Sequence, residues 1–179
     1  RMKFLFFLLL LFFSTGSWSQ QTALVSMSGI GEMRVGMKKA EVEKITGQPV
    51  KVVNLLRGEE DGDRDTVRLT HKGVAYELVF DRDYDHNSKD FLVYEVKSFS
   101  PGLRTVSGVA VGDDKIKIVT TYENYMIQLL PAYEGTGFAV RSKTRSTAWL
   151  FGDSTTMVII FYLTNNKITG FSVTYNEGC

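Results

Sequence analysis

The chain has 179 residues, 44% of them hydrophobic, which is enough for one sizeable core or two small cores that share a sheet. Its 21 basic and 20 acidic residues give a formal net charge of +1, so there is no overall electrostatic reason to bind nucleic acid or an anionic membrane. The single cysteine, Cys179, excludes a fold held by internal disulfides, and the fold must therefore depend on burial of apolar side chains.

The first nineteen residues have the pattern of a secretory signal peptide. Lys3 gives a positive start, residues 4–13 are an unbroken run of Phe and Leu, and small or polar residues follow as far as Ser19. This run is too short to span a membrane, which requires about 20 apolar residues in a helix. We expect cleavage after Ser19, no lipid-bearing cysteine and no stable membrane anchor, and a periplasmic or secreted protein. An uncleaved anchor or a buried helix is the alternative.

A weak internal repeat follows the signal segment. Residues 35–45 (VGMKKAEVEKI) recur as residues 111–121 (VGDDKIKIVTT), with Val-Gly at the start of both copies. Each copy predicts a short amphipathic helix, over residues 37–46 and 113–123. Gly47 and Pro49 indicate where the first helix ends.

Strand-like runs follow each predicted helix. They cover residues 50–56, 66–71, 74–80 and 91–99 in the first copy, and 126–132, 137–141, 146–151, 156–163 and 168–175 in the second. Lys72-Gly73 and Asn165-Asn166 are tight-turn signals between such runs. We predict an α+β fold of two tandem helix-plus-antiparallel-meander repeats, residues 20–100 and 101–179. The helices would lie on one face of the sheet and leave the other open to solvent.

Residues 35–49 (VGMKKAEVEKITGQP) resemble the helix of a superfamily of bacterial envelope domains. It includes the β-lactamase-inhibitor-protein-like domains and the SmpA/OmlA small outer-membrane lipoproteins, in which this helix leads into a strand meander. The resemblance implies that fold, an envelope compartment and, as a family tendency, protein binding. The chain departs from both groups because it has neither a cysteine pair nor an acylated amino-terminal cysteine. No functional residue of the superfamily has a counterpart here.

The sequence offers little for catalysis. Its only histidines are His71 and His86, with no cysteine near either, and the motifs of serine hydrolases, zinc peptidases, phosphate-binding loops and cysteine-paired zinc sites are absent. We therefore expect no enzymatic activity, no catalytic residues and no cofactor. A hydrolase that uses carboxylates alone is the alternative, because glycoside hydrolysis requires only two acidic groups.

Two further patterns have simple explanations. Asp81, Asp83 and Asp85 alternate as calcium ligands do, but the turn glycine and the bidentate glutamate of such loops are missing. We interpret this stretch as a solvated turn, with a calcium loop as the alternative. Gly29-Ile30-Gly31 begins like a dinucleotide fingerprint but lacks the third glycine and the βαβ unit, so we interpret it as a flexible lead-in.

Aromatic side chains are the better indication of recognition. They gather in the second half of the chain, and the candidate binding residues are Tyr122, Tyr125, Tyr133, Trp149, Phe151 and Tyr162. Large amphipathic rings on the open face of a sheet commonly anchor protein interfaces, although each ring could instead belong to the core. We therefore expect a non-catalytic module that binds another protein and is a monomer or weak dimer. A self-associating structural envelope protein, joined through Cys179 or a strand edge, is the other alternative.

Overall fold

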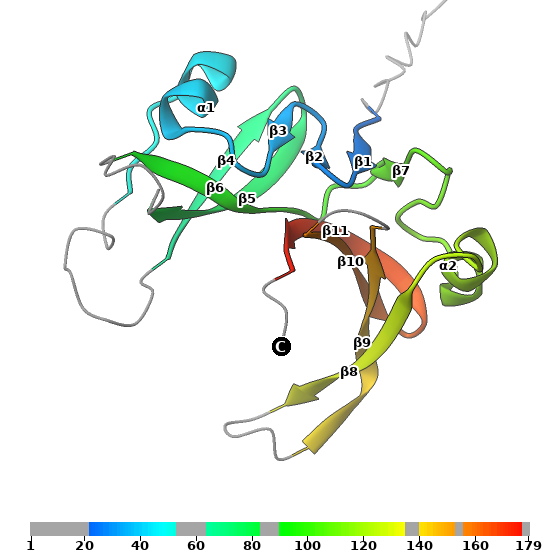
Figure 1. Ribbon diagram of the computed structural model, residues 1–179. Coiled ribbons are helices and arrows are strands. Elements are labelled where there is room, and N and C mark those ends of the chain that lie inside the picture. The colour runs from blue at the N-terminus through cyan, green and yellow to red at the C-terminus, as the bar shows by residue number, and fades with distance from the viewer. Residues whose placement is uncertain (1–21, 53–63, 83–89, 135–139, 153–155, 177–179) are drawn as a thin grey trace, which may run out of the picture.

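The computed structural model describes residues 22–52, 64–82, 90–134, 140–152 and 156–176, which form two sheets and two short helices (Figure 1). The protein is mainly β, with 57% strand and 12% helix. The prediction of an α+β fold built from two tandem helix-plus-meander repeats is therefore wrong. Strands dominate the molecule, and a second sheet is present that the prediction did not contain.

The larger sheet has seven strands in the order β4-β5-β6-β11-β10-β9-β8, and every neighbouring pair is antiparallel. The strands are β4 (Asp65–His71), β5 (Val74–Arg82), β6 (Phe91–Ser98), β8 (Ile127–Glu134), β9 (Val140–Phe151), β10 (Met157–Thr164) and β11 (Lys167–Tyr175). Two hairpins close at Lys72-Gly73 and Asn165-Asn166, where all four residues have positive φ, as tight type I′ turns require. β6 and β11 pair at the middle of the sheet and so join the two halves of the sequence.

The smaller sheet has the order β3-β2-β1-β7. Its strands are β1 (Leu24–Ser26), β2 (Gly29–Ile30), β3 (Met33–Arg34) and β7 (Arg104–Thr105), and β1 pairs with β7 in parallel. The interpretation of Gly29-Ile30-Gly31 as a flexible lead-in is wrong, because Ile30 is 0% exposed and lies in the core. Strands of two or three residues are too short to show the alternation by which a strand is recognised in a sequence.

The helices are α1 (Lys39–Thr46) and α2 (Lys115–Thr121), both shorter than the predicted ranges. Each has a single buried residue, Val42 in α1 and Ile118 in α2. α1 ends at Gly47, which takes the left-handed conformation at φ 66°. Helices of this length depend on packing for their stability, so they are minor additions to a β structure.

The repeated Val-Gly sequence encodes a local attachment to the large sheet. The Gly36 N–H donates to the Val93 carbonyl at 2.7 Å, and the Gly112 N–H donates to the Ile168 carbonyl at 2.8 Å. Both glycines have positive φ, which their missing side chain permits at no steric cost. The two copies thus fix the segments before α1 and α2 to the beginnings of β6 and β11.

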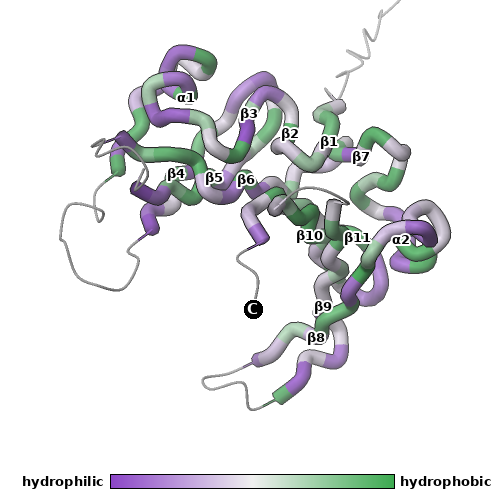
Figure 2. The backbone as a smooth tube through the Cα atoms, in the orientation of Figure 1, coloured by the Kyte–Doolittle hydropathy of each residue, from purple (hydrophilic) through white to green (hydrophobic). Residues whose placement is uncertain are grey.

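A single core lies between one face of the large sheet and a covering layer of small sheet and helices. Its largest fully buried side chains include Phe80, Phe161 and Phe171 from the large sheet and Ile30 and Met33 from the small one. All described helices and small-sheet strands pack on this side, as Figures 1 and 2 show. We call the other side of the seven-stranded sheet the open face.

Candidate functional site

The open face is an ordered array of side chains, because the register of the strands aligns them across the sheet. One row of directly paired residues crosses all seven strands: Arg68, Glu77, Lys97, Ser172, Ile160, Trp149 and Gln128. The neighbouring row contains Thr66, Val79, Glu95, Thr174, Val158 and Phe151. In both rows the residue on β11 is small, so larger side chains on β6 and β10 stand on either side of a hollow.

The two halves of the open face differ in chemistry. The half formed by β4, β5 and β6 is charged, and its charges neutralise one another. Its ion pairs are Arg68–Glu77 at 2.8 Å, Arg64–Asp81 at 3.1 Å and Lys97–Glu95 at 3.5 Å. The half formed by β9 and β10 instead carries Tyr162, Trp149 and Phe151, which are half-buried, with Ile160 and Val158 buried between the strands on the same side.

A cavity of about 470 Å³ lies over the junction of these halves. Trp149 and Tyr162 line one side of it, and Tyr94 and Tyr175, from the start of β6 and the end of β11, line another. Ile160, only 7% exposed, and Thr174 contribute from the central strands. We call this cavity the aromatic hollow. Concave sites of this kind, mostly apolar with a few polar groups, are typical of binding sites.

Neighbouring side chains fix the orientation of the rings on the apolar side. The Trp149 indole N–H donates to the Thr147 hydroxyl at 3.1 Å, and its ring lies 6.4 Å from that of Phe151. The Tyr162 ring contacts Phe99 at a centroid distance of 5.2 Å. Rings held in this way lose little conformational entropy when a partner binds them.

Two cations lie over aromatic rings beside the hollow. The Arg64 guanidinium carbon is 3.4 Å from the centroid of Tyr94, and the Lys97 ammonium is 5.4 Å from that of Tyr162. Burial acts to lower the pKa of Lys97, but Tyr162, Glu95 and Glu77 together outweigh it and raise that pKa. Lys97 is therefore a fixed positive charge at neutral pH, and it is already compensated by neighbours on the protein.

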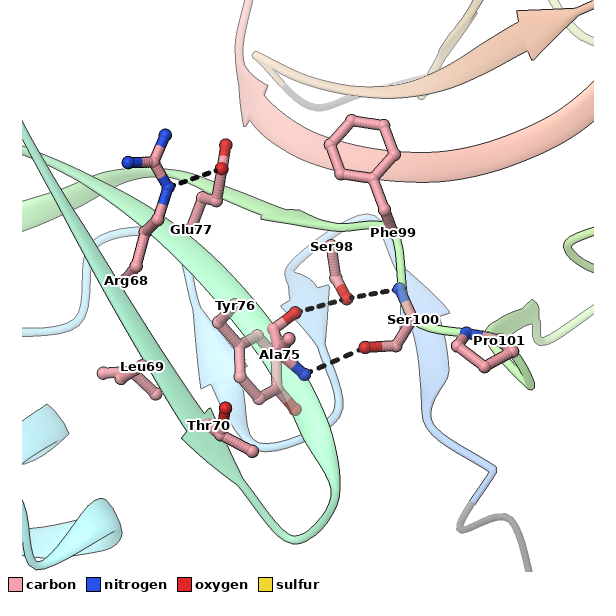
Figure 3. A pocket seen from close by; sticks show the side chains of 10 residues that line it. All are labelled: Arg68, Leu69, Thr70, Ala75, Tyr76, Glu77, Ser98, Phe99, Ser100 and Pro101. Atoms are coloured by element: carbon pink, nitrogen blue, oxygen red, sulfur yellow. Dashed lines mark hydrogen bonds and ion pairs between the residues drawn. The ribbon is translucent and has the colours of Figure 1, made fainter.

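A second cavity, of about 490 Å³, lies where β6 separates from β5 (Figure 3). Beyond the last β5–β6 pair, serine side chains take the place of the backbone hydrogen bonds between the two strands. The Ser98 hydroxyl donates to the Ala75 carbonyl at 2.7 Å, and the Ser100 hydroxyl accepts the Ala75 N–H at 2.9 Å. Phe99 and Pro101 line the same cavity. The serine hydroxyls already serve the backbone here, so the cavity has the character of an apolar binding recess rather than of a nucleophilic centre.

The structure places three of the predicted binding residues together. Trp149, Phe151 and Tyr162 lie half-buried on the open face, the first and third of them at the aromatic hollow. The other three lie elsewhere. Tyr122 is in the core at 7% exposure, with its hydroxyl donating to Thr105 at 2.7 Å, and Tyr125 packs edge-on against its ring at 5.9 Å.

Tyr133 lies on β8, is 41% exposed and pairs directly with Arg141, and it is not among the residues that line the aromatic hollow. Of the proposed calcium ligands, Asp83 and Asp85 lie outside the described residues. Asp81 is on β5, where it pairs with Arg64. In the part of the chain that the structure describes, no cluster of three or more acidic, histidine or cysteine side chains is arranged to hold a metal ion.

Sequence reasoning did not identify Tyr94, Tyr175, Lys97 or Phe99 as parts of this surface. Strict alternation along β6 does not assign Tyr94 to a face, because the register shifts where Val79 and Phe80 of β5 meet this strand. The Glu95-Val96-Lys97 alternation was the available signal for the charged half. Phe99 packs across β11 on Gly170, a contact between distant parts of the chain.

No helix among the described residues is long and apolar enough to cross a membrane. No protein-family model matches the chain, and no curated protein or solved structure is detectably similar to it.

Proposed function

We propose that the protein is a non-catalytic binding module that holds another protein against its open face. The observation that carries this proposal is the aromatic hollow, in which Trp149, Tyr162 and Ile160 form an apolar centre beside mutually paired charges. Tight protein interfaces have this composition: a few large aromatic anchors are surrounded by polar groups that contribute little energy. The partner's surface is convex and uncharged where it enters the aromatic hollow.

The arrangement of acidic groups favours binding over hydrolysis. A carboxylate-only hydrolase needs one protonated and one ionised carboxyl group facing the substrate. On the open face Glu77, Glu95 and Asp81 each form an ion pair with a cation of the protein. These pairs direct the three carboxyl groups toward cations and not toward a second carboxyl group.

The proposed place of action is the periplasm or the surrounding medium. This part of the proposal rests on the signal-peptide pattern of residues 1–19 and on the resemblance of residues 35–49 to bacterial envelope domains. The amino-terminal sequence of the exported protein tests it directly. A chain retained in the cytoplasm with residues 1–19 intact would contradict it.

The chain offers a sensitive probe of the open face, because its only tryptophans are Trp18 and Trp149. In a Trp18→Phe chain, tryptophan emission comes from Trp149 at the aromatic hollow alone. The experiment is affinity capture from envelope and secreted fractions, followed by fluorescence titration of the Trp18→Phe chain with the captured partner. We expect a partner that shifts the Trp149 emission. Titration calorimetry, which needs no tryptophan, should show at least a tenfold loss of affinity in the Trp149→Ala, Tyr162→Ala double variant.

Tyr125→Ala is the matched control, because it removes an exposed ring on the helix side of the sheet. It should leave the affinity unchanged. A partner that binds both variants as tightly as the parent chain contacts another surface, and the proposal is then wrong. Turnover in a hydrolase screen that Glu77→Gln or Glu95→Gln abolishes would contradict it in a different way.

A further inference from the structure

The β8–β9 hairpin extends beyond the rest of the large sheet. β9 pairs with β10 only over Arg145–Phe151, whereas Val140 and Arg141 pair with β8 alone. We call residues 131–134 and 140–145 the arm, which Figure 1 shows projecting from the large sheet, away from α1 and the small sheet. A two-stranded ribbon without a third strand is only marginally stable in water. Contact with another molecule would stabilise the arm.

A bulge in β9 sets the direction of the arm. The pairing jumps from Pro131–Ser146 to Tyr133–Arg141, and the intervening turn is held by the Ser142 hydroxyl, which accepts the N–H groups of Thr144 at 3.3 Å and Arg145 at 3.0 Å. The Asn165 N–H donates to the Thr144 carbonyl at 2.7 Å and ties the base of the arm to the β10–β11 turn. Bulges bend a strand and redirect its side chains, so the exit of the arm is specified locally.

The arm has an excess of positive charge. Arg141, Lys143 and Arg145 are exposed, and Glu134, which approaches Arg145 at 3.5 Å, is the one acidic residue of the arm. Within the described part of the chain, neither Arg141 nor Lys143 forms an ion pair. This differs from the charged half of the open face, where cations and carboxylates compensate one another.

Apolar groups accompany these cations. Tyr133 is 41% exposed directly opposite Arg141, and Val140 is 60% exposed opposite Glu134. Arg145, Thr147 and Trp149 are alternate residues of β9, so their side chains lie on the same side of the strand. The base of the arm is therefore contiguous with the aromatic half of the open face. A partner seated at the aromatic hollow therefore has the base of the arm, at Arg145, on its β9 side, and the rest of the arm extends from there.

We propose that the arm binds an acidic segment of the protein that docks on the open face. This inference rests on the proposed function and adds the chemistry of the partner: an uncharged apolar protrusion at the hollow, flanked by Asp or Glu residues that meet Arg141 and Lys143. Complementary charges at the edge of an interface accelerate association and select against wrong partners, more than they slow dissociation. Binding through the arm is accordingly sensitive to salt.

The experiment measures binding of a defined acidic probe and then of the captured partner. A blocked hexaglutamate peptide is titrated into the isotopically labelled full chain, with a blocked Gly-Ser repeat peptide of equal length as control. Amide shift changes should gather at the described arm residues at about 20 mM salt and vanish at about 300 mM. Arg141→Gln with Lys143→Gln should weaken hexaglutamate binding at least about threefold.

Lys44→Gln with Lys51→Gln is the matched control, since both lysines are exposed and lie in or after α1. It should bind hexaglutamate as the parent chain does. Shift changes centred on α1, or an equal loss in the control variant, would overturn the proposal. So would stronger arm-dependent binding to vesicles of phosphatidylglycerol than to hexaglutamate, because the ligand would then be a lipid surface.

The two proposals fail in different ways. A captured partner that depends on Trp149 and Tyr162, but whose affinity is unchanged by Arg141→Gln with Lys143→Gln and by salt, supports the proposed function and overturns the role of the arm. A partner that depends on the arm cations and not on the aromatic hollow contradicts the proposed function, and with it the basis of this inference.

Discussion

The two faces of the seven-stranded sheet carry similar side chains with different roles. On the covered face Phe80, Phe161 and Phe171 are fully buried beneath the small sheet and the helices. On the open face Trp149 and Tyr162 are as large but only half-buried. Apolar content therefore does not decide which face becomes the core. The covering layer decides it, and the rings without a cover remain available for another molecule.

The largest expected effect is the loss of a ring from the covered face. Phe171 is 0% exposed and contacts Phe161 edge-on at 5.2 Å, so Phe171→Ala removes a buried ring and leaves a cavity. We expect a loss of about 3–5 kcal/mol in the free energy of unfolding. Urea denaturation followed by circular dichroism measures it. A loss below about 1 kcal/mol would mean that the two faces are equivalent.

Gly170→Ala tests a place where the open face is closely packed. A Cβ here would collide with the Phe99 ring and lie 2.8 Å from the Ser98 carbonyl oxygen. We expect about 1–3 kcal/mol of destabilisation, because backbone and ring must both move. The Phe99→Ala, Gly170→Ala double variant should lose less than the sum of the two single changes, since it removes one of the two collisions. Additive losses would argue against that contact.

Trp149→Ala is the opposite test to Phe171→Ala. The indole is half-buried and donates its N–H to the neighbouring Thr147 side chain, so we expect a loss of no more than about 1.5 kcal/mol in the free energy of unfolding. Partner affinity should nevertheless fall at least tenfold. A variant that unfolds as readily as Phe171→Ala would place Trp149 in the core, and the distinction between the faces would fail.

The smallest expected effect concerns the contact of Glu32 with His71 and Lys72, which joins the small sheet to the large one and which we call the clasp. Glu32, in the β2–β3 turn, accepts hydrogen bonds from the Lys72 ammonium and from His71 of β4, each at 2.6 Å. These bonds, that of Lys72 first, hold the pKa of Glu32 below its ordinary value. The stabilisation is therefore present above the pKa of the unfolded carboxyl group and is lost as pH falls through the lowered pKa of the folded one.

Glu32→Gln should lower the melting temperature slightly at pH 7 and not at pH 3. Thermal denaturation of parent and variant at both pH values measures the difference. Glu123→Gln, a change at an exposed residue beyond α2, is the control and should show no pH-dependent difference. Equal effects of Glu32→Gln at both pH values would mean that the clasp contributes nothing as an ion pair.

Much of the large sheet follows from local signals in the sequence. Lys72-Gly73 and Asn165-Asn166 adopt the positive φ values that tight hairpins require, and alternation locates the strands on either side. The small sheet does not follow, because its strands have two or three residues and owe their existence to pairing with distant segments. The α+β prediction is wrong for this reason, and because the two helices have only eight and seven residues.

The candidate site was only partly accessible to the same reasoning. Trp149 and Tyr162 lie on regular strands, where alternation assigns a face once the neighbouring residues are placed. Tyr122 looks equivalent in the sequence, but it ends α2 and turns into the core to contact Phe161. Tyr94 lies at a register shift that no pattern in the sequence of β6 indicates. Rings at strand irregularities and helix ends need tertiary information before they can be assigned.

The parallel pairing of β1 with β7 also fixes the order in which the protein can fold. Leu24 pairs with Arg104 and Val25 with Thr105, so β1, which meets β2 within a few residues of chain, lacks its second neighbour until more than half of the chain is available. Contacts between residues so far apart in sequence form slowly, since a long loop must close first. A chain threaded through a membrane pore from its amino terminus would thus leave this edge of β1 unpaired until residue 105 has passed, and the covering layer would be completed as a late step.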